Sequence, residues 1–316
     1  MNRREAVCGL VLAGFASALL ARRAAAQVSK KLRIGYQKNG VLVIARRQAV
    51  LEKRLDRDGV GVEWVEFPAG PPLLEAMTAG EIDVGQVGDT PPIFAQAAGA
   101  PIVYVAGQSI TNGQGILVRS DSDITALVGL KGKRIGFTKG SSAHNVVLLA
   151  LEKTGLTYGD IVPVYLSPGD AAAAFARRSI DAWAVWDPYY AIGENVGGGR
   201  VLAHASALGK TNAFYIANRA FAAREPLLLR SVLDTLGETA QWAEAHRDQV
   251  AQALSDVTGV DLAIQAIAAR RSSFAIGKLT DDIITTQQGV ADRFFKLGLI
   301  PRPIVIREVI WAAPQS

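Results

Sequence analysis

The chain has 316 residues, 49% of them hydrophobic and 20% charged, and a formal net charge of +5 at pH 7. This is the composition of a globular protein long enough to form two lobes with a sizeable core. Four arginines and one glutamate among the first 26 residues account for three of the five positive charges. The remaining lysines and arginines are scattered and form no basic stripe with interleaved aromatic residues, so we expect no nucleic acid as a partner.

A cleaved signal peptide is predicted over residues 1–26. The basic start Asn2-Arg3-Arg4 precedes an apolar run at 6–20, and the small residues Ala24-Ala25-Ala26 favour cleavage before Gln27. The apolar run is shorter than the roughly 20 residues of a membrane-spanning helix, and a retained N-terminal anchor is the alternative. We therefore expect export to the periplasm, with both the Sec and the twin-arginine routes left open.

The only cysteine, Cys8, lies inside this leader, so the mature chain would have no thiol for disulfides or catalysis. The three histidines, His144, His204 and His246, are far apart and match no metal-binding spacing, so we expect neither a metal nor another cofactor. The sequence has no G-x-S-x-G motif and no evident triad of nucleophile, base and acid. These absences predict a binding protein rather than an enzyme.

Strand and helix patterns alternate along the first part of the mature chain. The predicted elements are strands at 32–36, 62–67, 82–87 and 101–108, and helices at 41–55, 71–79 and 91–99. Such alternation predicts an α/β fold with a mostly parallel sheet covered by helices on both faces. Ligands of such sheets bind outside the carboxyl ends of the strands.

The pattern then begins again. Arg33-Ile34-Gly35-Tyr36-Gln37-Lys38 reappears 101 residues later as Arg134-Ile135-Gly136-Phe137-Thr138-Lys139. Ile82-Asp83 reappears 98 residues later as Ile180-Asp181, and Asp89 corresponds to Asp187 at the same offset. Two matches in the same order at nearly one offset predict two lobes built on one plan.

We expect lobe I to comprise residues 27–115 and 216–316, and lobe II residues 116–215. Residues 216–316 read as mainly helical, with Thr280 as the N-cap of the last helix, and we expect this block to pack on lobe I. The chain would then cross between the lobes twice, which makes a hinge around a cleft.

Four turns would face this cleft, at 37–40, 88–91, 139–145 and 186–190. Helix starts leave backbone N–H groups unpaired, and the helix dipole adds positive potential, so such turns bind anions. They also carry the side-chain donors Asn39, Thr90, Ser141, Ser142 and Asn145. No G-x-x-x-x-G-K-[ST] motif is present, so a small oxyanion fits better than a nucleotide. The alternative is that the hydroxyl groups only cap their helices.

Four further candidate residues have two interpretations each. Asp89 and Asp187 either hold their loops by accepting backbone N–H bonds or contact a ligand hydroxyl or amine, because a carboxylate repels an anion. Trp186 either packs or covers an apolar ligand tail. His144 either donates to an anion or is a packing residue.

Several segments together resemble the aliphatic sulfonate-binding proteins of ABC importers. They are Ile34-Gly35-Tyr36-Gln37-Lys38, Trp64-Val65-Glu66-Phe67-Pro68-Ala69-Gly70-Pro71, Gly88-Asp89-Thr90-Pro91-Pro92-Ile93-Phe94-Ala95-Gln96-Ala97, Lys139-Gly140-Ser141-Ser142-Ala143-His144-Asn145, Trp186-Asp187-Pro188-Tyr189-Tyr190, Pro301-Arg302-Pro303-Ile304-Val305-Ile306-Arg307 and Trp311. The resemblance covers essentially the whole mature chain. The segment 111–115 is less typical of the family, which leaves the ligand range open.

This resemblance implies a type II periplasmic binding fold that captures alkanesulfonates for sulfur acquisition. It implies delivery to a membrane permease with its ATPase, and we expect the binding protein to be a monomer. By matching motif, the expected ligand-binding residues are Gln37, Asn39, Gly40, Gly88, Asp89, Thr90, Ser141, Ser142, His144, Asn145, Trp186 and Asp187. The alternatives are a binding protein for taurine, nitrate or a thiamine-pyrimidine precursor, and a pyrimidine-synthase-like enzyme on the same fold.

Overall fold

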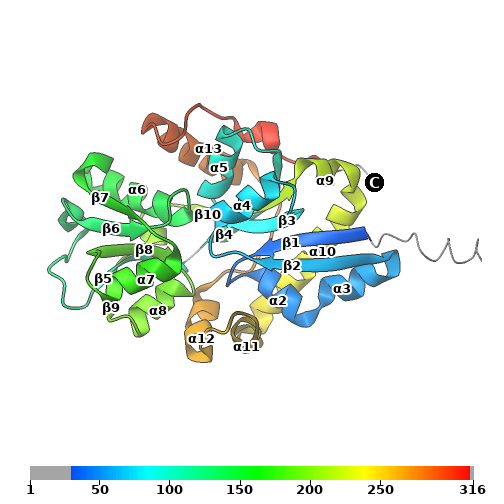
Figure 1. Ribbon diagram of the computed structural model, residues 1–316, viewed down its shortest axis with the longest axis horizontal. Coiled ribbons are helices and arrows are strands. Elements are labelled where there is room, and N and C mark those ends of the chain that lie inside the picture. The colour runs from blue at the N-terminus through cyan, green and yellow to red at the C-terminus, as the bar shows by residue number, and fades with distance from the viewer. Residues whose placement is uncertain (1–29, 111, 314–316) are drawn as a thin grey trace, which may run out of the picture.

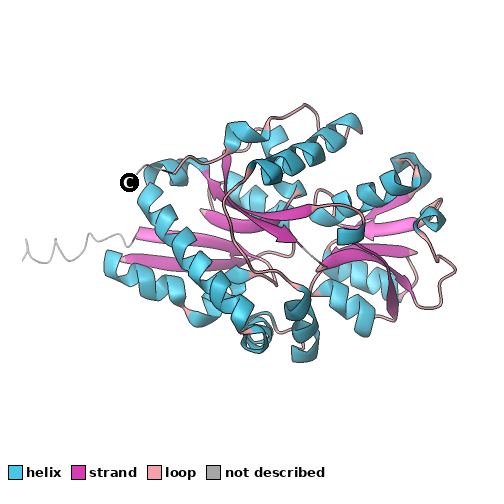
Figure 2. Cartoon of the chain, turned by 180° about the vertical axis from the view of Figure 1, so that it is seen from behind, coloured by secondary structure: helices cyan, strands magenta, loops and turns pink. Residues whose placement is uncertain are grey.

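A computed structural model describes residues 30–110 and 112–313 (Figure 1). The predicted signal peptide, with Cys8, lies outside the described residues. The described chain forms two lobes side by side, each built around a five-stranded sheet with helices on its faces (Figures 1 and 2). Within this part of the chain no helix is long and apolar enough to cross a membrane.

Lobe I contains the first sheet and most of the helices. Its strands are β1 (Lys30–Tyr36), β2 (Val60–Glu66), β3 (Val84–Gly88), β4 (Ile102–Ile110) and β10 (Thr211–Asn218). Its helices are α2 (Val41–Gln48), α3 (Val50–Leu55), α4 (Gly70–Thr78), α5 (Thr90–Ala97), α9 (Arg219–Arg224), α10 (Pro226–Ala245), α11 (Arg247–Thr258), α12 (Leu262–Arg271) and α13 (Asp281–Lys296). Thr280 caps α13 as predicted, because its hydroxyl accepts the N–H of Ile283.

Lobe II contains the second sheet and three α-helices. Its strands are β5 (Gln114–Arg119), β6 (Arg134–Phe137), β7 (Val162–Tyr165), β8 (Ala182–Trp186) and β9 (Gly199–His204). Its helices are α6 (Ser142–Thr154), α7 (Pro168–Ala176) and α8 (Tyr189–Asn195). Helices α4, α5, α7 and α10 carry proline in their first two positions, where its fixed φ suits a helix start and its missing N–H costs nothing.

The two sheets have the same strand order, β2-β1-β3-β10-β4 and β7-β6-β8-β5-β9. The first three strands of each are parallel, and the fourth, β10 or β5, is antiparallel to both neighbours. The predicted two-lobed α/β fold is confirmed, and the sheets are mixed. The chain enters lobe II with β5 and returns to lobe I with β10, so each reversed strand is the first of its lobe after a crossing. The predicted lobe boundaries at 115/116 and 215/216 fall inside these two strands.

The duplicated plan extends to side-chain contacts. Asp83 accepts the backbone N–H and the Nε–H of Arg33 at 2.8 and 3.1 Å, and Asp181 accepts the same two groups of Arg134 at the same distances. In both lobes a guanidinium Nη2 completes the pair, at 2.7 and 2.9 Å. In the sheet order, each pair ties the second strand, β1 or β6, to the turn before the third strand, β3 or β8.

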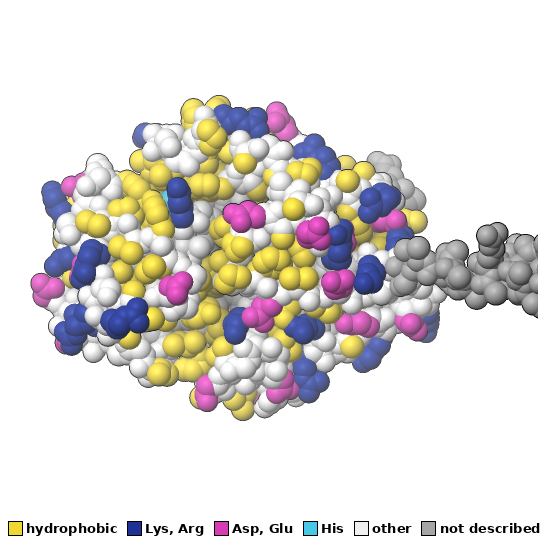
Figure 3. Space-filling view, in the orientation of Figure 1, with side chains coloured by type: hydrophobic (Ala, Val, Ile, Leu, Met, Phe, Trp, Pro, Cys, Tyr) yellow, Lys and Arg dark blue, Asp and Glu magenta, His cyan; other side chains and the backbone are white. Residues whose placement is uncertain are grey.

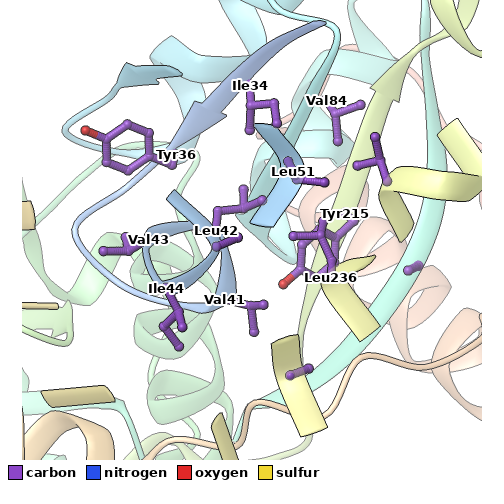
Figure 4. Packing of buried hydrophobic residues seen from close by; sticks show 14 of the residues in the cluster. Ile34, Tyr36, Val41, Leu42, Val43, Ile44, Leu51, Val84, Tyr215 and Leu236 are labelled. Carbon is purple, nitrogen blue, oxygen red and sulfur yellow. The ribbon is translucent and has the colours of Figure 1, made fainter. Parts of the chain in front are cut away.

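The lobe I core lies on both faces of its sheet. On one face, Ile34 and Tyr36 of β1 and Tyr215 of β10 pack with α2, α3 and α10 (Figure 4). On the other face, α4, α5 and α13 cover the sheet through Leu73, Ile93 and Phe294, among others. The C-terminal block therefore packs on lobe I as predicted, but α12 also contacts α8 of lobe II.

The repeated ion pairs predict unequal stability losses. The side chains of Arg33 and Asp83 are 31% and 4% exposed, and those of Arg134 and Asp181 are 45% and 29% exposed, so water reaches the arginine left behind less easily at the first site. We expect Asp83→Ala to lower the free energy of unfolding by about 3 kcal/mol and Asp181→Ala by about 1 kcal/mol. Urea denaturation of the two variants measures both values, and equal losses would contradict the assignment of the difference to burial.

Candidate functional site

A cavity of about 100 Å³ lies where the two lobes meet. Its walls come from both lobes and from the C-terminal helices. The lining residues are Gln37, Asn39, Gly40, Gly70, Gln86, Val87, Gly88, Pro91, Gln108, Ser109, Ile110, Gly113, Gln114, Ser141, Ser142, Trp186, Asp187, Ala213, Leu254, Gln265, Ala268, Ser272, Ser273 and Phe274. The cavity thus lies at the carboxyl ends of the parallel strands, where open α/β sheets bind ligands.

Eight of the twelve predicted site residues line this cavity: Gln37, Asn39, Gly40, Gly88, Ser141, Ser142, Trp186 and Asp187. The other four, Asp89, Thr90, His144 and Asn145, are buried outside it.

The start of α6 forms part of the cavity wall. Gly140 has a φ of 71°, a left-handed conformation that turns the chain from β6 toward the helix. The hydroxyl of Ser141 donates to the backbone oxygen of Thr138 at 2.7 Å, so it does not cap the helix as the alternative interpretation held. The N–H of Ser141 donates to the backbone oxygen of Thr138 at 3.2 Å and that of His144 to Ser141 at 3.0 Å, so the N–H groups of Ser142 and Ala143 are those left without an acceptor at the helix start. This leaves the positive end of the α6 dipole at the cavity.

Asp187 is the one charged residue among those that line the cavity, and its carboxylate is paired with Arg271. The guanidinium donates to both carboxylate oxygens at 2.7 Å, and its third nitrogen donates to Glu194 at 2.7 Å. The guanidinium carbon also lies 4.5 Å from the centre of the Tyr190 ring. Burial raises the pKa of Asp187, and the hydrogen bonds and charge of Arg271 oppose that rise.

Asp187 also joins the two lobes. Its carboxylate accepts the N–H of Ala191 at 3.1 Å, which fixes the start of α8. Its backbone oxygen accepts the side-chain amide of Asn39 from lobe I at 2.9 Å. The loop-holding interpretation of Asp187 therefore describes its carboxylate, while the residue still lines the cavity.

A second contact between the lobes lies outside the cavity. Asn145 of α6 donates to the Asp89 carboxylate at 2.8 Å and accepts from Arg293 of α13 at 3.2 Å. The other oxygen of Asp89 accepts the hydroxyl of Thr90 at 2.8 Å. Burial raises the pKa of Asp89 to about 6, although these hydrogen bonds oppose it. Asp89 and Asn145 thus hold lobe II against lobe I, and Thr90 orients the Asp89 carboxylate, while none of the three lines the cavity.

His144 is a packing residue. Its ring is surrounded by aromatic side chains from both lobes, namely Phe94, Phe137, Tyr158, Tyr165 and Phe294. Its Nδ1 accepts the N–H of Gly140 at 3.3 Å, which requires an unprotonated Nδ1. Burial, together with the charge of Lys139, lowers its pKa to about 3. The ring is therefore neutral, and it lies among aromatic side chains outside the cavity lining rather than against a bound anion.

Sequence reasoning missed Gln114, at the start of β5, and two groups of lining residues. Gln86 and Gln108 lie within apolar strands, and the Nε2 of Gln37 donates to the backbone oxygen of Gln86 at 3.2 Å. A glutamine near the carboxyl end of an otherwise apolar strand was the available signal. The second group, from 254 to 274, comes from helices and a loop without the strand–turn–helix pattern, and nothing in the sequence marks it.

A family comparison identifies the chain. The model of the NMT1-like family matches residues 25–256, which is more than half of the chain. The chain belongs to this family. An aliphatic sulfonates-binding protein of Escherichia coli K12 is 40% identical over 309 residues, covering 97% of this chain and 96% of that protein.

Two solved structures are similar over most of their length. The alkanesulfonate-binding protein SsuA of Xanthomonas axonopodis pv. citri, bound to MOPS, is 40% identical with a TM-score of 0.83, covering 89% of this chain and 98% of that one. The periplasmic aliphatic sulphonate binding protein SsuA of E. coli is also 40% identical, with a TM-score of 0.81 and coverage of 91% and 94%. These relatives are binding proteins, in agreement with the expectation of binding rather than catalysis.

The environment of His144 predicts a pH-dependent stability difference. An unfolded histidine takes up a proton near pH 6.5, whereas the buried ring takes one up only near pH 3, so protonation favours the unfolded chain between these values. Relative to His144→Phe, we expect the free energy of unfolding of the wild type to fall by about 1.4 kcal/mol for each pH unit below 6.5.

Denaturant unfolding of both proteins from pH 7 to pH 4 measures this difference. Taking the difference cancels the titration of carboxylates common to both proteins, including Asp89. A difference that does not change with pH would contradict a neutral, buried His144.

Proposed function

We propose that this chain is the periplasmic substrate-binding component of an ABC importer and captures aliphatic sulfonates for sulfur acquisition. The observation that carries the proposal is the cavity between the lobes, which offers neutral donors and the start of α6 but no unpaired charge. The 40% identity to sulfonate-binding relatives over nearly the full length supports the same ligand class. The MOPS bound to the Xanthomonas relative is itself a sulfonate.

A sulfonate matches this wall chemically. It stays ionised at all physiological pH values and offers only acceptor oxygens, so it binds to fixed N–H and O–H donors. Ser142 at the start of α6 and the amides of Gln37 and Asn39 supply such donors, and the helix dipole favours the negative charge. The apolar faces of Trp186 and Phe274 lie in the same cavity and suit an alkyl tail. The Asp187 carboxylate is held by Arg271 and is proposed to orient the wall rather than bind the anion.

The remaining parts of the proposal follow from this role. Residues 1–26 direct export and are removed, and the closed, loaded form is recognised by a membrane permease with its ATPase. Charged side chains of both signs are interspersed over the face drawn in Figure 3, without a basic field suited to nucleic acid. The cavity volume of about 100 Å³ is small for a ligand site and favours a short tail.

Ligand-dependent stability tests this proposal. Short alkanesulfonates should stabilise the processed protein by about 2.7 kcal/mol at a hundredfold excess over their Kd, because they bind only the folded chain. Nitrate and a pyrimidine phosphate should produce little stabilisation. Differential scanning fluorimetry measures the change in melting temperature, and the absence of a shift with every sulfonate would overturn the assignment.

Closure of the lobes can be tested at Gly88. A Cβ added to Gly88 of lobe I would lie 2.7 Å from the Cβ of Ser142 in lobe II, so the contact obstructs only the closed arrangement. We expect Gly88→Ala to raise the Kd for a sulfonate about tenfold or more, because the added methyl group must move Gly88 and Ser142 apart. Gly237→Ala is the matched control, because a Cβ there meets nothing within 4 Å. Equal affinities of the two variants would show that this closed contact is not needed for binding.

A further inference from the structure

Gln114 is the most unusual polar residue of the cavity. It is 1% exposed, and neither Oε1 nor Nε2 of its side chain has a hydrogen-bond partner. Gln265 of α12 also lines the cavity, and its Nε2 donates to the Thr258 hydroxyl at 3.0 Å while its Oε1 has no partner. Buried side-chain amides in folded proteins are nearly always paired, so free amides in a ligand cavity point to groups that the ligand supplies.

The fold explains how Gln114 reaches the cavity. Alternate residues of a strand lie on one face, so Gln114 shares its face with Ile116 and Val118, which pack against α6. Because β5 is reversed, its first residue pairs with Trp186, the last residue of β8. Gln114 therefore lies at the carboxyl edge of the sheet, close to the start of α6, where the sulfonate is proposed to bind.

A sulfonate group can satisfy the amide N–H but not the amide oxygen. Both ends of the Gln114 amide are free, so exchanging the positions of its nitrogen and oxygen does not change this conclusion. The free oxygens of Gln114 and Gln265 are both acceptors and need a donor. An alkyl chain carries no such donor, and its binding would leave both oxygens buried and unpaired.

The charge of the wall decides between the two common donors, a hydroxyl and an ammonium. A buried ammonium requires a carboxylate partner, and the one carboxylate among the lining residues, that of Asp187, is already held by Arg271. A neutral hydroxyl needs only an amide oxygen.

We propose that the preferred ligand is a short hydroxyalkanesulfonate, and that Gln114 determines this preference by accepting the ligand hydroxyl at its Oε1. The inference rests on the proposed function and makes it more specific. The proposed function requires a sulfonate head group, and the inference adds that the tail carries a hydroxyl group.

Isothermal titration calorimetry of the purified, processed protein tests this with three ligands of nearly equal size: ethanesulfonate, 2-hydroxyethanesulfonate and 2-aminoethanesulfonate. We expect the hydroxylated ligand to bind about tenfold or more tightly than ethanesulfonate, because a site built to pair a hydroxyl discriminates against the analogue that lacks it. We expect the amino compound to bind more weakly than the hydroxylated one.

The variant Gln114→Met keeps the length of the side chain and removes its hydrogen-bonding groups. It should bind ethanesulfonate and 2-hydroxyethanesulfonate with equal affinity, whereas the exposed control Gln252→Met should keep the wild-type preference. A melting curve establishes that each variant is folded. The ligand series on the wild type tests the inference even if Gln114→Met does not fold.

The outcomes separate the two proposals. Equal wild-type affinities for ethanesulfonate and 2-hydroxyethanesulfonate would overturn the inference and leave the sulfonate-binding function standing. Tightest binding of the amino compound would overturn the choice of a hydroxyl. A preference that persists in folded Gln114→Met would overturn the role of Gln114, and failure of all three sulfonates to bind would overturn the proposed function itself.

Discussion

One buried ion pair fixes lobe II against the C-terminal helices. Arg271, at the end of α12, holds both carboxylate oxygens of Asp187, which follows β8. Removing a carboxylate from water is costly, and a bidentate partner with further hydrogen bonds is what offsets that cost. Those further bonds come from Ala191 on the carboxylate and from Asn39 on the backbone oxygen. Arg271 and Asn39 lie outside lobe II, so the hydrogen bonds that they donate to Asp187 form only when the two lobes meet.

The same pair determines how the cavity can hold an anion. Had Asp187 no partner, its charge would repel any oxyanion at the start of α6. Had Arg271 no partner, the wall would carry a positive charge and attract anions of every kind. Because Arg271 holds the carboxylates of both Asp187 and Glu194, it is not available as a charged partner for a ligand. Recognition then depends on neutral donors and the helix dipole, whose contribution depends on geometry. Such a wall distinguishes ligands by where their acceptors and donors lie.

The sequence predicted the strands and helices that repeat in both lobes, and it missed β5 and β10, the strands with which the chain passes from one lobe to the other. Strand–turn–helix units leave a local signal in the sequence. The pair of Arg33 and Asp83 recurs in lobe II because both lobes connect two neighbouring parallel strands by the same Arg–Asp contact. The reversed strands β5 and β10 leave no such signal, because an apolar strand reads the same in either direction and its sheet is chosen by distant partners. The lobe boundaries were therefore placed inside strands, and Gln114 was not recognised as a site residue.

The site was predictable to the level of the turn but not of each side chain. Within one helical turn successive residues point in different directions, so a turn that faces a cavity also carries residues that face elsewhere. Ser141 and Ser142 line the cavity, whereas His144 and Asn145, two and three residues beyond Ser142, contact α5, α13 and Asp89. Their contacts depend on where lobe I lies, which no local pattern records.

The two roles of α6 would couple the proposed ligand binding to closure of the lobes. The first turn of the helix carries the proposed anion site, and the buried side of the helix packs on lobe I through His144 and Leu148. A rigid helix cannot withdraw from lobe I without also carrying its first turn away from the lobe I donors Gln37 and Asn39. An anion bridging these groups and the buried aromatic contact therefore favour the same arrangement of the lobes. The bound anion and the aromatic contact would each stabilise this arrangement of the lobes, and neither interaction requires an unpaired charged side chain in the cavity.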